Sequence, residues 1–481
     1  MLHVNTNTTI LSAALACAMS AGLARPVSAE PASANVTDEH IADAISTDLF
    51  YHDRVDSNNV NVAVSDGVAT LKGEVKTMLS KRRAVKAAQS IRGVRSVIDK
   101  ILVVPEERTD DAILSDIHES IRMNDATESS DVIVRINNGN VTLSGTTESF
   151  AEKDLAETVV AGVLGVRSIE NKLEIQTPVK RPADEIKADV EGRLAHSVWV
   201  DEAPIVVSVD GHDVMLTGAV GSSAERLKAI KLAYVEGVKY VLADDLYVSS
   251  FFEDEERKKE PAAPNFTDAE IKQAIEDAFL IDPSVSESDV RVRVEGNAVT
   301  LTGFVATLAA KNAAERDARH TVGVQRVNNL IAVRPGSWSP DTQVAESIRA
   351  ALLRDALLND QVVKTRVDEG VAVLSGEVKT EFERERAEMI AASIPGVIAV
   401  VNKLEADRAW TWQPDLEIKE DVNDQLFWSP FVDADDVSVK VDDGIVTLTG
   451  SVSDYSEMTA ARDNAFEGGA KDVILKLDLE S

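Results

Sequence analysis

The chain has 481 residues, with 82 Asp and Glu against 50 Lys and Arg, which gives a net charge of −32 at pH 7. A surface this acidic repels nucleic acid and bulk anionic lipid, which argues against a general nucleic-acid role. The apolar share of 44% is sufficient for buried cores, and the chain is too long for one small domain.

The first 29 residues have the pattern of a secretory signal peptide. An uncharged apolar run, TILSAALACAMSAGL, covers residues 9–23, and small residues precede position 30. We expect cleavage after Ala29 and a periplasmic mature protein that begins at Glu30. The only cysteine, Cys17, lies inside the apolar run, so disulfides and thiolate metal sites are excluded from such a mature chain. The alternative is a lipid anchor on Cys17.

A short phrase with two glycines recurs six times after this segment. Its copies are GVATLKG, GNVTLSG, GHDVMLTG, GNAVTLTG, GVAVLSG and GIVTLTG, and the third and fourth carry one extra residue between the glycines. The first glycines are 72, 72, 85, 74 and 74 residues apart, so the period is that of a domain. They are Gly67, Gly139, Gly211, Gly296, Gly370 and Gly444, and the second glycines are Gly73, Gly145, Gly218, Gly303, Gly376 and Gly450.

Each repeat predicts the same elements in chain order. An apolar triad at i, i+4, i+8, such as Ile41, Ile45 and Leu49, predicts an amphipathic helix. Alternating β-branched residues then predict a strand, and a glycine beside Asp, Asn or Glu predicts a tight hairpin into a second strand. A second helix ends at a glycine, and a last strand follows.

The fold class is therefore α+β: a tandem array of six small α-β-β-α-β domains, each with a three-stranded mixed sheet and two helices on one face. We place the repeats at residues 37–104, 109–176, 183–248, 267–335, 340–405 and 414–480, with a charged, Pro-containing linker at 249–266. Units this small are marginal alone, so we expect contacts between neighbouring repeats, with coupling of the nearest-neighbour kind.

The glycine phrase has two interpretations. A phosphate-binding loop needs a helix N-terminus directly after it, and here a short strand comes first. We therefore interpret the first glycine of each copy as part of a hairpin turn and the second as the end of a strand.

These motifs resemble the BON domain, the bacterial osmotic-shock and nodulation domain. The resemblance rests on the helix stripe, on the hairpin V-x-V-x-V-x-(D/N)G-x-V-x-L-x-G, and on the later GV-x-x-(V/I)-x-N-x-L at 165–173 and 396–404. It implies a non-catalytic module of the cell envelope, often periplasmic, for which attachment to phospholipid or an envelope polymer has been proposed.

No catalytic motif emerges from the sequence. The seven histidines are scattered and none has metal-binding spacing, and no G-x-S-x-G elbow occurs. Asp433, Asp435 and Asp436 could meet calcium but lack the glycine and distal Glu of an EF-hand loop. We therefore expect no enzyme, no cofactor, no metal and no small-molecule substrate.

One stretch reverses the global charge. Residues 72–100 hold nine Lys and Arg against Glu74 and Asp99, so this segment of the first repeat carries +7. If the protein contacts anionic phospholipid or an envelope polymer, we expect the contact through Lys81, Arg82, Arg83 and Lys86. The alternatives are an ordinary solvated helix face on a purely structural, solubilising acidic stress protein, or an adaptor that binds other envelope proteins.

Overall fold

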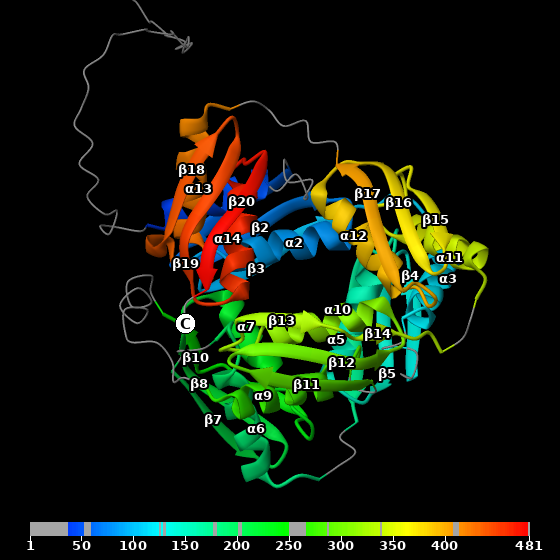
Figure 1. Cartoon of the computed structure of the whole chain (residues 1–481), viewed down its shortest axis with the longest axis horizontal. Helices are drawn as coiled ribbons and strands as arrows, with labels where there is room; N and C mark the ends of the chain where they lie inside the picture. The colour runs from blue at the N-terminus through cyan, green and yellow to red at the C-terminus, as the bar shows by residue number, and fades with distance from the viewer. Residues whose placement is uncertain are drawn as a thin grey trace, which may run out of the picture. The chain divides into compact units, whose positions relative to one another are not determined.

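The computed structural model describes residues 37–51, 59–124, 127, 131–176, 180–200, 204–249, 266–285, 288–336, 339–406 and 413–479. The expected signal peptide, Cys17 and residues 250–265 of the expected linker lie outside these ranges. Within them the chain forms six α-β-β-α-β repeats, as the sequence predicts (Figure 1).

The first three repeats occupy the N-terminal half of the chain. Repeat 1 consists of α1 Asp38–Tyr51, β1 Val60–Ser65, β2 Val68–Val75, α2 Met78–Gln89 and β3 Ser96–Val103. Repeat 2 consists of α3 Asp110–Arg122, β4 Asp131–Asn137, β5 Asn140–Thr147, α5 Phe150–Ala161 and β6 Ser168–Ile175. Repeat 3 consists of α6 Ala183–Ala195, β7 Ile205–Asp210, β8 Asp213–Val220, α7 Ser223–Leu232, β9 Tyr240–Leu242 and β10 Leu246–Val248.

The last three repeats follow the same order. Repeat 4 consists of α9 Asp268–Ile281, β11 Asp289–Glu295, β12 Ala298–Val305, α10 Leu308–Arg319, β13 Arg326–Asn329 and β14 Ala332–Val333. Repeat 5 consists of α11 Asp341–Arg354, β15 Lys364–Asp368, β16 Val371–Val378, α12 Glu381–Ser393 and β17 Ala399–Ala406. Repeat 6 consists of α13 Asp415–Trp428, the 3-10 turn η2 Ala434–Asp436, β18 Val437–Asp442, β19 Ile445–Val452, α14 Tyr455–Glu467 and β20 Asp472–Leu479.

Each sheet is mixed and has the second strand at its centre. In repeat 1, β1 pairs antiparallel with β2, and β3 pairs parallel with β2 on the other side. The last strand of repeats 3 and 4 is broken into two short pieces, but both pieces pair parallel with the central strand. The three-stranded prediction therefore holds in all six repeats.

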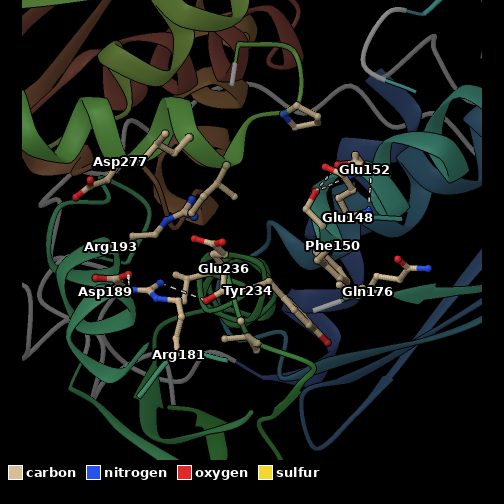
Figure 2. A pocket seen from close by; sticks show the side chains of 18 residues that line it. Glu148, Phe150, Glu152, Gln176, Arg181, Asp189, Arg193, Tyr234, Glu236 and Asp277 are labelled. Carbon is tan, nitrogen blue, oxygen red and sulfur yellow. Dashed lines mark hydrogen bonds and ion pairs between the residues drawn. The ribbon is translucent and has the colours of Figure 1, made fainter. Parts of the chain in front are cut away.

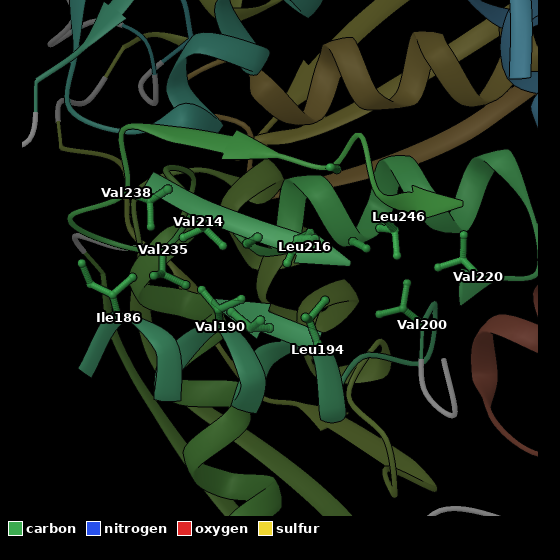
Figure 3. Packing of buried hydrophobic residues seen from close by; sticks show 14 of the residues in the cluster. Ile186, Val190, Leu194, Val200, Val214, Leu216, Val220, Val235, Val238 and Leu246 are labelled. Carbon is green, nitrogen blue, oxygen red and sulfur yellow. The ribbon is translucent and has the colours of Figure 1, made fainter. Parts of the chain in front are cut away.

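Each repeat buries its own core between helices and sheet. In repeat 3 the helix triad Ile186, Val190 and Leu194 packs on Val214 and Leu216 of the central strand (Figure 3). The corresponding first-helix triads of the other repeats are also buried, except that Ile121 of repeat 2 is half-buried. The apolar stripe predicted from spacing is therefore the face that holds each helix on its sheet.

The hairpin glycines lie at two-residue turns with positive φ. In repeat 6, Asp443 has φ 53° and Gly444 has φ 77°, the conformation that a tight hairpin with right-handed strand twist requires. The extra residue between the two glycines of the third and fourth copies reflects where the first glycine lies in the turn. Their turns are also two residues long, and Gly211 and Gly296 occupy the first turn position instead of the second.

The second glycines do not end their strands, so the strand-end interpretation needs correction. The β2 strand continues two residues past Gly73, which faces Val60 at the start of β1. A Cβ at Gly73 would lie 1.7 Å from the carbonyl oxygen of Asn59. Glycine is therefore required at position 73, because the backbone at the start of the neighbouring strand is too close to leave room for a Cβ.

In five repeats an aspartate at the start of the first helix accepts hydrogen bonds from the hairpin turn, and we call this contact the clasp. In repeat 1 the backbone N–H groups of Asp66 and Gly67 donate to the Asp38 carboxylate at 2.7 and 2.9 Å. The residues that play the Asp38 role elsewhere are Asp110, Asp268, Asp341 and Asp415. Ala183 stands at this position in repeat 3. The clasp ties the start of the first helix to the turn 28 residues later.

Contacts between repeats are not confined to neighbours in sequence, contrary to the nearest-neighbour expectation. A short antiparallel bridge joins repeat 2 to repeat 5, where Leu164 N–H donates to Arg354 O at 3.0 Å and Ala356 N–H to Gly162 O at 2.9 Å. The same bridge joins repeat 3 to repeat 4, through Val322 N–H to His196 O and Val198 N–H to His320 O.

The pairing of repeat 1 with repeat 6 keeps half of this bridge. Arg92 N–H donates to Trp428 O at 2.9 Å, as Leu164 does to Arg354. The second donor position holds Pro430, which has no N–H. The repeats are thus paired in nested order: 3 with 4, 2 with 5 and 1 with 6.

Candidate functional site

The four expected contact residues lie on α2, and Lys81 is held against its own sheet. Its ammonium group is 3.0 Å from the Asp99 carboxylate and donates to the Ile101 carbonyl at 2.7 Å. Ala84 and Ala88, three and seven residues further along the same side of the helix, are fully buried, and Ile91 beyond its end is buried too. Lys81 is therefore oriented along the edge of repeat 1.

The two arginines of α2 contact other repeats. Arg82 is 3.2 Å from the Glu157 carboxylate of repeat 2. The guanidinium carbon of Arg83 lies 3.5 Å from the ring centroid of Phe382 in repeat 5, and Figure 1 shows α2 and α12 side by side. Lys86 is exposed. The structure thus brings three of the four residues into contacts within the chain and leaves Lys86 at the surface.

Arg92 belongs to the same basic stretch but is only 5% exposed. Its Nε donates to the Ser429 carbonyl and its terminal nitrogen to the Val432 carbonyl, both at 2.8 Å. Spacing along α2 could not predict this burial because the partner lies more than 330 residues away. Arg92 holds repeat 6 against repeat 1.

A second basic surface lies on the side of the repeat 1 sheet that faces away from the helices. Lys72 on β2 and Lys100 on β3 are directly opposite in register. Beside them Ile98, Leu102 and Val104 are 44%, 62% and 51% exposed. We call these five residues the first-sheet face. Glu74, opposite Leu102, is an acidic residue on the same side.

The equivalent surface of repeat 2 differs in charge. The register places Glu170 where repeat 1 has Ile98, and Glu174 where it has Leu102, while Lys172 matches Lys100. Lys172 is paired with Glu170 at 2.8 Å. Lysines beside exposed aliphatic side chains therefore distinguish the first-sheet face from this surface of the next repeat.

Metal sites are another kind of chemistry that the described residues could carry. No group of three or more His, Cys, Asp or Glu there is arranged to hold a metal ion. Asp433 accepts a hydrogen bond from Asp435 N–H at 3.1 Å and caps η2. None of the helices in the described ranges has the length and apolar character needed to cross a membrane.

Comparison with known proteins agrees with this architecture. The model of the BON domain matches residues 37–105, 109–177, 182–249, 267–335, 340–408 and 414–479. Osmotically-inducible protein Y of Escherichia coli (strain K12) is 33% identical over 147 residues, covering 29% of this chain and 73% of that protein.

Two solved structures are also similar. Both are of CdsD, a structural protein of the type III secretion system of Chlamydia trachomatis; one is its C-terminal domain. They are 16% and 13% identical, cover 46% and 48% of this chain and 100% of their own, and have TM-scores of 0.13. The six family matches, each of which coincides with one α-β-β-α-β repeat, show that this chain belongs to the BON domain family.

Proposed function

We propose that this protein is a non-catalytic binding and scaffold protein of the cell envelope that acts in osmotic stress. Two findings support this. All six repeats are BON domains, and the similar Escherichia coli protein is named for osmotic induction. The described residues form paired domains that hold one another in place, which suits a scaffold.

The proposed location is the periplasm. It is supported by the uncharged apolar run at residues 9–23 and the small residues before position 30. N-terminal sequencing of the purified protein should give Glu30, and osmotic-shock fractionation should release the protein with other periplasmic proteins. A chain that begins at an acylated Cys17 would contradict this location.

The proposed binding surface is the first-sheet face, directed at anionic phospholipid. Its lysines, Lys72 and Lys100, are exposed, whereas Lys81, Arg82 and Arg83 are engaged within the chain. A basic side chain close to an anionic membrane contributes about 1 kcal/mol, and the Debye length of about 8 Å limits repulsion from distant acidic repeats. Exposed Ile98, Leu102 and Val104 add apolar area beside this charge. This combination of lysines and aliphatic side chains is the observation that carries the proposal.

Flotation of the full-length mature chain with liposomes that contain anionic phospholipid tests this surface. Wild-type protein should float at low salt and less at high salt. Replacing both lysines, Lys72→Glu and Lys100→Glu, should abolish flotation. Lys172→Glu, at the position equivalent to Lys100 in repeat 2, is the matched control and should float like wild type.

Two other outcomes separate the alternatives. Flotation that Lys72→Glu/Lys100→Glu leaves intact would place the membrane contact elsewhere. If neither protein floats, the chain acts as a structural, solubilising protein or as an adaptor for other envelope proteins. Cross-linking in osmotically shocked cells distinguishes those two, because only an adaptor gives a defined cross-linked partner.

A further inference from the structure

A cavity of about 410 Å³ lies where repeats 2, 3 and 4 meet. Its walls come from the start of α5, from α6 and the loop after α7, and from the end of α9 (Figure 2). The rings of Phe150 and Tyr234 stack at 3.9 Å and form an aromatic part of the wall. The volume lies within the range of protein pockets for small molecules.

Arg193 is the unusual residue of this cavity. Its guanidinium makes no hydrogen bond or ion pair with any described residue, and one terminal nitrogen is fully buried without a partner. Burial lowers the pKa of Arg193, but a guanidinium keeps its charge inside proteins. Asp277 and Asp189 attract it, and Asp317 does so when it is ionised, but none of the three forms an ion pair with it.

A second arginine in the same wall shows the contrast. Arg181 is 2.7 Å from the Asp189 carboxylate and donates to the Glu236 carbonyl at 3.3 Å. It is therefore fully used within the chain, whereas Arg193 is not. A buried charge without a partner is strongly destabilising, and such groups are rare in folded proteins. A carboxylate on a bound molecule would supply acceptor oxygens to the guanidinium nitrogens of Arg193 that are not fully buried.

The remaining charges of the wall restrict the ligand further. Glu148 and Glu236 are exposed residues that line the cavity, and neither carboxylate is paired with a described residue. Buried Glu152 also lines the cavity. A dianion such as phosphate would be repelled by these groups, while a molecule that also carries a positive charge would be attracted. The aromatic wall favours a cationic group as well.

We propose that the cavity binds an amino-acid-sized zwitterion. Its carboxylate would contact Arg193, and its cationic group would lie towards Glu236 and the rings of Phe150 and Tyr234. This inference goes beyond the proposed membrane contact and does not depend on it, since the first-sheet face belongs to repeat 1. The site is available only in a chain that assembles repeats 2, 3 and 4, so one BON domain cannot form it.

Isothermal titration of the full-length mature chain with L-proline and with glycine betaine tests the proposal. Acetate supplies the carboxylate without the cation, and inorganic phosphate supplies a multivalent anion. At least one zwitterion should bind more tightly than acetate and phosphate. Arg193→Met should weaken zwitterion binding about 10- to 100-fold, as expected for loss of a charge-assisted pair. Arg291→Met, at a 76% exposed position of repeat 4, should leave it unchanged.

Two further measurements guard against misfolding. Ligand-free Arg193→Met should unfold at the same temperature as wild type or at a higher one, because the variant removes an unpaired buried charge. Glu236→Gln should weaken zwitterion binding but not acetate binding. The proposal is overturned if neither zwitterion binds, if folded Arg193→Met binds as wild type does, or if phosphate binds most tightly.

Discussion

At the scale of the residue, the two glycines of each hairpin have different physical roles. In repeat 3, Gly211 has φ +64°, and a Cβ there would meet nothing within 4 Å. Gly218 has φ +120°, and a Cβ there would lie 2.0 Å from the Pro204 carbonyl oxygen. The first position therefore needs glycine only for its backbone conformation, and the second needs it for space as well.

Alanine at these two positions should separate the effects. Gly211→Ala should reduce the stability of repeat 3 by about 1 kcal/mol, the strain of a left-handed non-glycine residue. Gly218→Ala should cost about 3 kcal/mol or more, because the strands must also move apart. Hydrogen exchange of β7 and β8 amides measures both. Equal losses of protection would contradict the distinction.

Buried titratable groups between repeats 3 and 4 make stability depend on pH. Burial, with help from the Asp282 carboxylate, raises the pKa of Asp317 to about 8. Burial, with help from Lys228, lowers the pKa of His320 to about 3. The contribution of Asp317 to the free energy of unfolding is fully present below its unfolded pKa of about 3.9 and is lost as pH rises to about 8. The His320 contribution has the opposite slope, but only below about pH 6.5.

The interval from about pH 6.5 to about pH 8 therefore isolates Asp317. Burial also lowers the pKa of Lys228 to about 8, so that group acts mainly above this interval. We expect wild-type stability to fall by about 1 kcal/mol across it, and Asp317→Asn to remove the fall. Thermal unfolding at the two pH values provides the measurement. A wild-type chain that becomes more stable towards pH 8 would contradict the raised pKa.

At the scale of the element, the turn that follows the second helix contributes to the pairing of the repeats. Leu164 lies beyond α5, which ends at Ala161 and not at the predicted Gly165, and its N–H donates to Arg354 of repeat 5. Pro395 occupies the equivalent position before Gly396 in repeat 5. The local conformation therefore tolerates proline, and the N–H is needed only for the bridge.

Leu164→Pro should leave repeat 2 folded and weaken its pairing with repeat 5. Loss of one backbone hydrogen bond should cost about 1 kcal/mol, and amides near Ala356 should exchange faster. Glu236→Pro is the matched control, because Glu236 holds the same position in repeat 3, where Val322 of repeat 4 makes the bridge. Unchanged exchange at Ala356 in Leu164→Pro would show that the bridge contributes nothing.

The helices and strands could be predicted from the sequence, but the pairing of the repeats could not. Triads such as Ile186, Val190 and Leu194 repeat at helical spacing because each helix buries one face, so a single chain displays the pattern six times. The bridges use backbone N–H and carbonyl groups, which every sequence has. The Asp38 clasp had a detectable signal, an aspartate 28 residues before the turn, which was missed because it lies outside the glycine phrase.

At the scale of the whole molecule, the charged groups are arranged differently from what composition indicates. The basic stretch of repeat 1 predicts a solvated or membrane-facing helix, because sequence places like charges together. In the structure Arg82 and Arg83 reach two different repeats and Arg92 reaches a third. Long cationic side chains thus hold acidic domains together, and no local pattern reveals their distant partners. The cavity at Arg193 was missed for the same reason.

Arg92 should be important for holding the first and last repeats together. Arg92→Met removes the donors to Ser429 O and Val432 O and leaves two buried acceptors without partners, which should cost about 2–4 kcal/mol. Hydrogen exchange should rise in α13 and at the end of α2. Arg95→Met, three residues later at an exposed position, is the control. Equal exchange in the two variants would contradict the assigned role.

The nested pairing has a consequence for how the chain is completed. Repeats 3 and 4 are consecutive and can meet as soon as both exist, whereas repeat 2 must wait for repeat 5 and repeat 1 for repeat 6. Loop closure grows costlier with the length of chain between partners, although slowly. Assembly should therefore proceed outward from the middle of the chain. The carbonyl groups that Arg92 contacts belong to repeat 6, which is synthesised last. A polypeptide that stops before residue 414 would therefore expose the surface of repeat 1 that repeat 6 covers, and this exposed surface would distinguish it from the complete chain.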